Sequence, residues 1–316
     1  MRFPALIVLA FASFAAAAQL SSRPITILVP IAAGGAPDIA ARVIAAKLSE
    51  SLGQPVVVEN RTGANGNIAM DLVAKSAPDG HTLGLVADSQ IAINPHLYKS
   101  MPLDTLHDLT PVIPVAVNQF VLTVNPKLPV KNFAEFIEYA RKANPPLAYA
   151  SGGNGSQHHL TMEMLKQRAG IDMLHVPFKG GTPAAAAAVA GDVAAVWSGS
   201  SNAAQIKAGR LRAIAVSGSK RSPIYPDLPT ISEFYPGFVT EIWLGLFGPA
   251  NLPAPVLEKL RTEVRKVLES PDTKVKLNNA GGLDPFVASP EAFEAMIRRD
   301  YEKYAKVVKD LNLKLD

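Results

Sequence analysis

Near its start the sequence places a strand, a glycine loop and a helix in immediate succession. A β-branched run at 25–29 ends at a proline, and an alanine-rich helical stretch follows at 39–48. Between them stand Gly34 and Gly35, which let the backbone turn tightly with its N–H groups exposed. Pro37 suits the first turn of a helix, where its missing amide would have no partner. The free amides and partial positive charge of a helix N-terminus make this loop a candidate anion site, although many such turns bind nothing.

The same alternation of strand and helix continues to about residue 98. Strand-like runs at 55–59 and 82–87 are separated by turns and helical stretches. Short unbroken apolar strands that alternate with helices are typical of a parallel sheet covered on both faces. Ligands bind at the carboxyl ends of such strands, so the polar loop 88–90 is a second candidate edge of a site.

Residues 109–125 interrupt this pattern, because two β-rich runs follow one another without a helix between them. A strand-like run at 241–249 follows much later and could carry the chain back. Two crossings predict two lobes that close by hinge motion. The predicted boundaries are 19–119 with 243–316 for the first lobe and 120–242 for the second, with linkers near 117–125 and 240–248.

The alternation resumes in the predicted second lobe, where two more glycine-rich loops precede helices. These loops are 151–156 and 177–182. Ser156 and Thr182 stand where a helix N-cap is expected, because their side-chain oxygens can accept a hydrogen bond from the first turn. The repeated strand–glycine loop–helix unit favours a binding role for these loops.

The first 18 residues are predicted to be an export signal. Arg2 supplies a short positive region, the run 5–14 is apolar but too short for a membrane anchor, and small residues precede a cleavage site near Ala18/Gln19. The sequence contains no cysteine, which excludes disulfides and a lipid-modified N-terminal cysteine. Removal of the signal leaves about 298 of 316 residues, enough for two domains with full cores.

The composition is that of an ordinary globular protein, with 18% charged and 48% hydrophobic residues. The net charge of +4 falls to +3 once Arg2 is removed. Lys and Arg are scattered without a basic stripe or interleaved aromatic residues, so the sequence predicts no nucleic-acid partner.

The order of short motifs along the chain resembles one known family. The motifs that carry the resemblance are Arg23-Pro24-Ile25, 30–38, Val58-Glu59-Asn60-Arg61, Asn65-Gly66, 78–82, Ile93-Asn94-Pro95, 149–160, 176–180, Pro229-Thr230 and Gly281-Gly282. In this order they are similar to the periplasmic solute-binding proteins of the tripartite tricarboxylate transporter system, the Bug-type receptors. The resemblance covers nearly the whole chain after the predicted signal.

The resemblance implies an α/β, two-lobed type II periplasmic-binding-protein fold, each lobe a mostly parallel sheet flanked by helices, with the ligand cleft between lobes. It implies a receptor without catalytic activity or cofactor. Its ligand would be a small carboxylate, which is a di- or tricarboxylate, an acidic amino acid or an aromatic acid. Its partners would be the membrane components of the transporter, and we expect a periplasmic monomer without a lipid anchor.

Carried over by position, the resemblance also implies where the ligand binds. One carboxylate of the ligand would be gripped by the first strand–helix loop and another loop, largely through backbone amides and ordered water. The predicted ligand-binding residues are Ile31, Ala32, Ala33, Gly34, Gly35, Ala36, Pro37, Asp38, Ser89, Gly152, Gly153, Asn154, Gly155, Ser156, Gln157, His158, Lys179, Gly180, Gly181, Ser198, Gly199 and Ser200. Family members usually carry an aromatic residue at the position of Ile31, so an aliphatic side chain here leaves the identity of the ligand open.

Other chemistry was weighed against this interpretation. His159 and Glu163 share a helix face at i, i+4, but two ligands make a poor metal site. Ser156 beside His158 could suggest a nucleophile, yet there is no Gly-x-Ser-x-Gly elbow and no assignable acid, which disfavours an exported hydrolase. Asp38, in the first turn of a helix, is most simply stabilised by the helix dipole, whereas the resemblance implies that it orders the loop or a bridging water. Lys179 could face the ligand or water.

Two further alternatives concern the whole protein. A carboxylate-sensing receptor for a sensor kinase remains compatible with the sequence, whereas the sensing half of a transcription regulator would need a helix-turn-helix in place of the export signal. Trp197 and Trp243 are predicted to be core or hinge residues rather than ligand contacts.

Overall fold

A computed structural model describes residues 22–199, 202–222 and 224–315. The predicted export signal and Ser200 lie outside this part of the chain. Within the described ranges, no helix has both the length and the apolar character needed to cross a bilayer.

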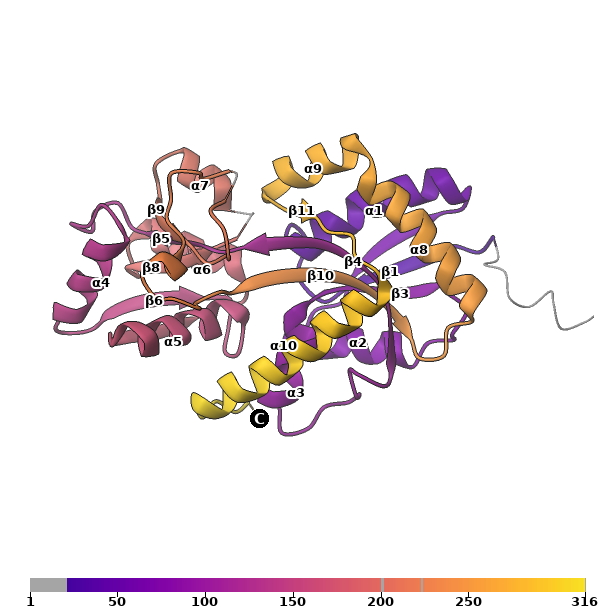
Figure 1. Ribbon diagram of the computed structural model, residues 1–316, viewed down its shortest axis with the longest axis horizontal. Coiled ribbons are helices and arrows are strands. Elements are labelled where there is room, and N and C mark those ends of the chain that lie inside the picture. The colour runs from indigo at the N-terminus through magenta and orange to yellow at the C-terminus, as the bar shows by residue number, and fades with distance from the viewer. Residues whose placement is uncertain (1–21, 200–201, 223, 316) are drawn as a thin grey trace, which may run out of the picture.

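The described chain forms two lobes, each built on its own sheet (Figure 1). Lobe 1 carries a six-stranded sheet in the order β11-β4-β10-β3-β1-β2. All its strands run in one direction except β10 and β11. The bounds are β1 Ile25–Val29, β2 Val56–Asn60, β3 Thr82–Ala87, β4 Leu109–Gln119, β10 Glu241–Pro249 and β11 Asp284–Pro285.

Lobe 2 carries a five-stranded sheet in the order β7-β6-β8-β5-β9, in which only β5 runs against the others. The bounds are β5 Val121–Val124, β6 Leu147–Ser151, β7 Met173–Pro177, β8 Ala195–Ser198 and β9 Arg212–Val216. The mostly parallel α/β architecture predicted for each lobe is therefore confirmed.

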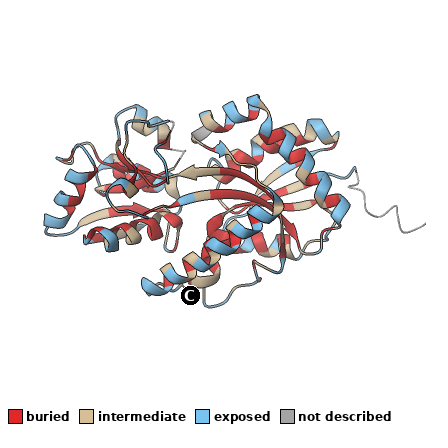
Figure 2. Cartoon of the chain, viewed as in Figure 1, coloured by how far each residue is buried: buried red, intermediate tan, exposed pale blue. Residues whose placement is uncertain are grey.

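Helices cover both faces of each sheet, and the strands between them are buried (Figure 2). In lobe 1, α1 and α8 pack on one face and α2 and α10 on the other. In lobe 2, α4 and α5 lie opposite α6. The bounds are α1 Ala36–Leu52, α2 Asn67–Ala74, α3 Asn94–Leu97, α4 Phe133–Lys142, α5 Gln157–Ala169, α6 Gly181–Ala190, α7 Ala203–Lys207, α8 Ala254–Glu269, α9 Pro271–Gly281 and α10 Pro290–Asp310.

Two paired strands, β4 and β10, run from lobe 1 to lobe 2 and form the hinge (Figure 1). Ser217, at the end of β9, is completely buried and joins both crossings. Its hydroxyl accepts from the N–H of Phe120 at 2.9 Å and donates to the carbonyl of Thr240 at 2.6 Å. Because both partners lie in the crossings, this one side chain fixes their separation.

Most local signals in the sequence act as expected. Pro37 lies in the first turn of α1, and the Ser156 hydroxyl caps α5 by accepting from the His159 N–H. Trp197 and Trp243 are buried in the cores. The prediction of Thr182 as a cap was wrong. Helix α6 begins two residues earlier than that prediction, at Gly181, because Gly180 with φ of +114° turns the chain and stands at the N-cap without a capping side chain.

Candidate ligand-binding site

The two glycines of the first loop have different roles. Gly34 has φ of +85°, a left-handed conformation that disfavours any side chain. Gly35 has φ of −81°, so its backbone tolerates other residues, and the expectation that it too is needed for the turn was wrong. A Cβ at Gly35 would instead overlap Cδ1 of Ile31. Gly34 therefore sets the backbone path, whereas Gly35 makes room for the Ile31 side chain.

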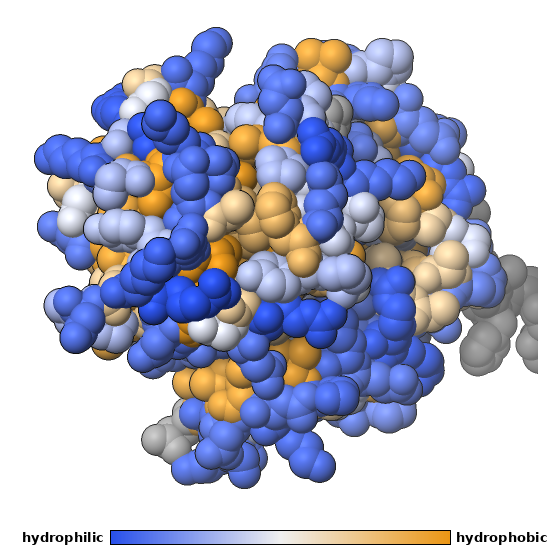
Figure 3. Space-filling view, turned by 60° about the vertical axis from the view of Figure 1, so that its left-hand side comes forward, coloured by the Kyte–Doolittle hydropathy of each residue, from blue (hydrophilic) through white to orange (hydrophobic). Residues whose placement is uncertain are grey.

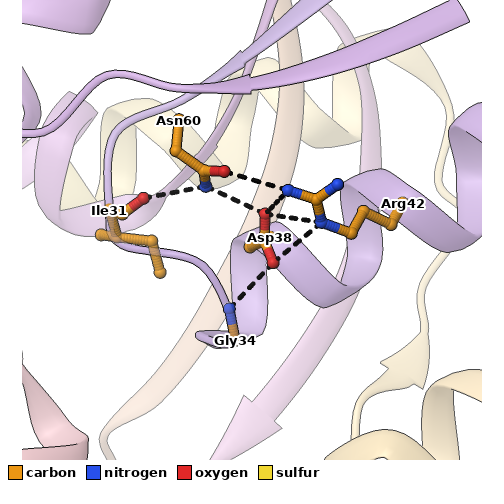
Figure 4. Close-up of polar contacts among 5 residues, drawn as sticks. All are labelled: Ile31, Gly34, Asp38, Arg42 and Asn60. Atoms are coloured by element: carbon orange, nitrogen blue, oxygen red, sulfur yellow. Dashed lines mark hydrogen bonds and ion pairs between the residues drawn. The ribbon is translucent and has the colours of Figure 1, made fainter.

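Asp38 locks this loop from the first turn of α1 (Figure 4). Its carboxylate, 3% exposed, accepts from the Gly34 N–H at 2.9 Å, from Arg42 Nε at 3.0 Å and from Asn60 Nδ2 at 2.9 Å. Asn60 also donates to the carbonyl of Ile31 at 3.0 Å. The lock thus joins the loop to the end of β2, and sequence reasoning missed Arg42 and Asn60 because their contacts depend on the fold.

Opposing effects act on the protonation of Asp38. Burial by itself raises the pKa of a carboxyl group, but hydrogen bonds from Arg42, the Gly34 N–H and Asn60 outweigh it and lower the pKa of Asp38. The carboxylate is charged at neutral pH and fully engaged within the protein. It orders the loop, and any role toward a ligand is indirect.

Backbone donors remain available on both lobes. Outside the regular elements, the N–H groups of Ala33, Gly152 and Asn154 donate to no protein group within the described chain, and neither does that of Ala36 at the start of α1. Ala33 and Asn154 are exposed. Such N–H groups, with the positive end of a helix behind Ala36, suit the oxygens of an anion.

The second glycine loop, 152–156, lies against lobe 1. A Cβ at Gly155, whose φ is +70°, would collide with Leu97 of α3 and with Leu315 near the C-terminus. Gln157, at the start of α5, donates to Asp88 at the end of β3. Ser89 follows Asp88 and opens the short π-helical turn 89–93. The loop is therefore held at the boundary of the two lobes.

His158 presents a neutral ring beside this loop. Its imidazole packs against Phe120 with the ring centroids 4.6 Å apart and the planes inclined by 42°. The ring also lies close to Gly152 and Gly181, where an added Cβ would be 3.2 Å and 3.5 Å from it. Burial lowers the pKa of His158 to about 4, so the ring is uncharged at neutral pH. It can donate one hydrogen bond and accept another there without adding a charge.

Residues 179–181, the next predicted part of the site, follow β7. They are held beside the second loop, because the Gly180 N–H donates to the Gly152 carbonyl at 3.2 Å. Lys179 is exposed there. Ser198 is completely buried, and its hydroxyl bonds to Thr123 at 2.7 Å inside the sheet. In this arrangement the Ser198 side chain has no exposed surface, whereas Gly199 beside it is partly exposed.

Two further histidines, His159 and His175, form a stack with Tyr149 that the sequence did not reveal. His175 lies between the rings of Tyr149 at 5.0 Å and His159 at 3.9 Å. His175 Nε2 is 2.6 Å from the Ser151 hydroxyl, and His159 Nδ1 accepts from the Gly155 N–H at 3.1 Å. The stack supports the glycine loop from behind.

The chemistry weighed earlier finds no support in this arrangement. Glu163 accepts from Tyr149 Oη at 2.6 Å and Lys166 Nζ at 2.9 Å instead of facing His159 as a metal ligand. In the described part of the chain, no group of three or more His, Asp or Glu could hold a metal ion. The Ser156 hydroxyl serves as a helix cap rather than as a nucleophile.

Two surface hollows lie away from this site. One, of about 460 Å³ beside α1 and α9, is lined in part by Lys47, Glu50 and Asp272, and Lys47 forms an ion pair with each of the two carboxylates. The other, of about 370 Å³, adjoins α2 and Tyr98. Polar side chains cover most of the face in Figure 3, with smaller apolar areas between them. Neither hollow brings together the free N–H groups of the glycine loops.

Comparison with known proteins places this geometry in context. Residues 40–313 match the family model described as tripartite tricarboxylate transporter family receptor. The structure of R. palustris Rpa4515 with adipate is 35% identical, with a TM-score of 0.87 over 92% of this chain and 98% of that one. MatC (Rpa3494) from Rhodopseudomonas palustris with bound malate is 31% identical, with a TM-score of 0.81 over 90% and 99%. The periplasmic binding protein BugD is 31% identical, with a TM-score of 0.85 over 93% and 99%.

Proposed function

The chain belongs to the tripartite tricarboxylate transporter receptor family, and from that premise we propose that it binds a small carboxylate and delivers it to the membrane components of such a transporter. The observation that carries the proposal is the set of N–H groups at Ala33, Ala36, Gly152 and Asn154 that donate to no group of the described chain. They come from both lobes, so one ligand between the loops would satisfy donors on each side.

The chemistry around these donors favours an anion that is held without a salt bridge. Asp38 is charged, but its carboxylate already accepts hydrogen bonds from Gly34, Arg42 and Asn60. The His158 ring is neutral. A carboxylate would be held by hydrogen bonds from N–H groups rather than by a cation. Hydrogen bonds to an ionised group are stronger than those between neutral groups, which suits this role. The relatives solved with adipate and malate support the same ligand class.

The side chain of Ile31 bears on which carboxylic acids bind. It packs over Gly35 at the edge of the first loop and offers an aliphatic surface with no ring for stacking. We therefore expect aliphatic di- or tricarboxylic acids to bind more tightly than aromatic acids. The predicted ligand-binding residues stay a proposal, with Gly34, Asp38 and Ser198 acting through the loops they hold rather than by direct side-chain contact.

Residues 1–18 bear on where in the cell the protein acts. Solved relatives are periplasmic binding proteins, and we propose that this chain is exported, cleaved near Ala18/Gln19 and active as a periplasmic monomer. Fractionation of a Gram-negative host with N-terminal sequencing should find Gln19 first in the periplasm. Full-length protein of 33.5 kDa in the cytoplasm would contradict export.

Binding itself is tested by mass spectrometry of ligand released from denatured protein, followed by a thermal-shift screen. Adipate, malate, citrate, glutamate and benzoate would be compared with a neutral sugar and a cationic amino acid. At 100 times its dissociation constant, a true ligand should add about 2.7 kcal/mol to the free energy of unfolding. A response to the sugar or the cation alone would mean that the ligand class is wrong.

A further inference from the structure

A polar contact between the lobes is buried where α5 meets lobe 1. Asp88, directly after β3, is 0% exposed, and Gln157, the first residue of α5, is 5% exposed. Gln157 Nε2 donates to Asp88 Oδ2 at 2.5 Å. The same nitrogen lies 3.0 Å from Tyr304 Oη and 3.4 Å from the Glu241 carbonyl oxygen. One side chain of lobe 2 thus reaches β3, α10 and the hinge strand β10.

An apolar contact lies beside it on the same helix. Leu160 of α5 is fully buried in a cluster with residues of lobe 1. The lobe 1 members of this cluster are Ala92, Ile93, Leu97, Tyr304 and Val308. Polar and apolar contacts together hold α5 against α10 in this arrangement of the lobes.

Asp88 lies in an unfavourable place for a charge. Burial, first, and the neighbouring carboxylate of Asp300 raise its pKa well above the usual range, while Lys303 and the hydrogen bond from Gln157 lower it in part. Its Oδ1 atom has no hydrogen-bond partner in the described chain. A buried carboxylate with one bare oxygen takes up a proton rather than stay charged.

The titratable and charged groups that face Asp88 come from two further elements. Asp300, Lys303 and Tyr304 belong to helix α10 and interact with Asp88 directly. Glu241 belongs to β10 and acts on Lys303, because its negative charge raises the pKa of that lysine. Asp300 is held by the indole N–H of Trp243 at 2.9 Å, and Lys303 donates to the Val239 carbonyl at 3.2 Å. Asp88 differs from these groups because one of its carboxylate oxygens, Oδ1, is buried without a hydrogen-bond partner in the described chain.

We propose that Gln157 and Asp88 form a proton-dependent clasp, in which closing α5 of lobe 2 onto lobe 1 takes up one proton on Asp88. When α5 withdraws, water reaches Asp88, and this hydration lowers its pKa from the raised value of the closed form, against the smaller opposing effect of losing the Gln157 donor. Between the pKa of the open form and that of the closed form, each unit of rising pH lowers the closing equilibrium by up to about tenfold. If the proposed receptor function holds, ligand affinity falls with it.

The closing step can be measured without any ligand. Helices α4 and α8 lie in different lobes, toward opposite ends of the molecule (Figure 1). Because the chain contains no cysteine, exposed Ala134 of α4 and Thr262 of α8 can be replaced by cysteine and labelled with a fluorescent donor and acceptor. Energy transfer should report closure near pH 4 and progressive opening toward pH 8. Circular dichroism at each pH confirms that the protein stays folded.

Three variants in this background decide the role of the clasp. Asp88→Asn keeps the acceptor for Gln157 without a titrating group, so it should stay closed with no pH dependence. Gln157→Leu fills the space without the donor and should open the lobes at every pH. The matched control Asp284→Asn, at an exposed carboxylate of lobe 1, should behave as the unmodified protein does. The proposal is overturned if the unmodified protein shows no change of energy transfer with pH, or if the change persists in Asp88→Asn.

Ligand titrations separate this proposal from the proposed function. Dissociation constants for adipate and malate would be measured by calorimetry from pH 5 to 8, and the ratio of unmodified protein to Asp88→Asn cancels the titration of the acid itself. That ratio should rise by up to about tenfold per pH unit. A ratio independent of pH contradicts the clasp. If neither acid binds either protein, the ligand class is wrong, and the energy-transfer response alone decides the clasp.

Discussion

Replacing Asp38 by asparagine removes the charge that locks the first loop. The side chain is 3% exposed and accepts from Gly34, Arg42 and Asn60. An asparagine keeps one oxygen and presents an NH₂ group to a site where every neighbour is a donor. At least one of the N–H groups of Gly34 and Asn60 then loses its acceptor.

The size of the effect can be worked out contact by contact. Hydrogen bonds to a charged group contribute about 1.5–3 kcal/mol, and a donor left unsatisfied costs about 1–3 kcal/mol. The Arg42 pair adds little, because its guanidinium is 53% exposed and screened by water. Loss of one such bond in full and weakening of the other gives a destabilisation of about 2–3 kcal/mol.

Asp38→Asn should also weaken binding, since the free N–H groups of Ala33 and Ala36 depend on the loop that Asp38 orders. We expect the dissociation constant for adipate or malate to rise at least about tenfold, or 1.4 kcal/mol. The pKa of Asp38 is lowered in the folded state, so its contribution is present above the unfolded pKa of about 3.9 and is lost as pH falls through the folded value.

Urea unfolding followed by circular dichroism at pH 7 measures the stability, and calorimetry measures the affinity. The exposed Asp192→Asn is the control and should change neither quantity. An Asp38→Asn protein within 0.5 kcal/mol of the unmodified protein, with affinity unchanged within twofold, would refute the reasoning, because the lock would then carry neither stability nor binding.

Three further predictions follow from the same structure. Gly35→Val adds bulk to the loop and must shift the end of the Ile31 side chain, so it should weaken carboxylate binding by at least roughly tenfold, or about 1.4 kcal/mol. Lys179→Ala at an exposed site should change binding less than about fivefold, and calorimetry showing the reverse order would place recognition on the lysine. Ser217→Ala should cost about 1–3 kcal/mol in urea unfolding, because the Phe120 N–H loses its buried acceptor, and no loss would mean that the hinge relaxes without it. Burial lowers the pKa of His175 to about 4, so its contribution to the free energy of unfolding is complete above about pH 6.5 and is lost as pH falls toward 4. His175→Gln should therefore flatten the pH dependence of the urea midpoint between about pH 6.5 and 4. An unchanged pH dependence would contradict this role of His175.

The sequence by itself determined the alternation of strands and helices and the positions of the glycine loops. These features depend on neighbours in the chain: β-branched runs make strands, Pro37 and Ser156 start helices, and Gly34 supplies a left-handed angle. The motif order also identified the family. Local rules failed at Thr182 because the turn at Gly180 had already begun the helix.

Only the tertiary structure decided what each of these loops is attached to. Asp38 meets Asn60 from 22 residues away, and Gln157 meets Asp88 from 69 residues away. Gly155 is favoured both by its φ of +70° and by the nearness of Leu97 and Leu315 from lobe 1, and His175 supports its loop from a neighbouring strand. Burial and long-range hydrogen bonds arise from the packing of two sheets and α10, so no local pattern encodes which carboxylate is charged, which is protonated, and which glycine is needed for space rather than for its backbone angle.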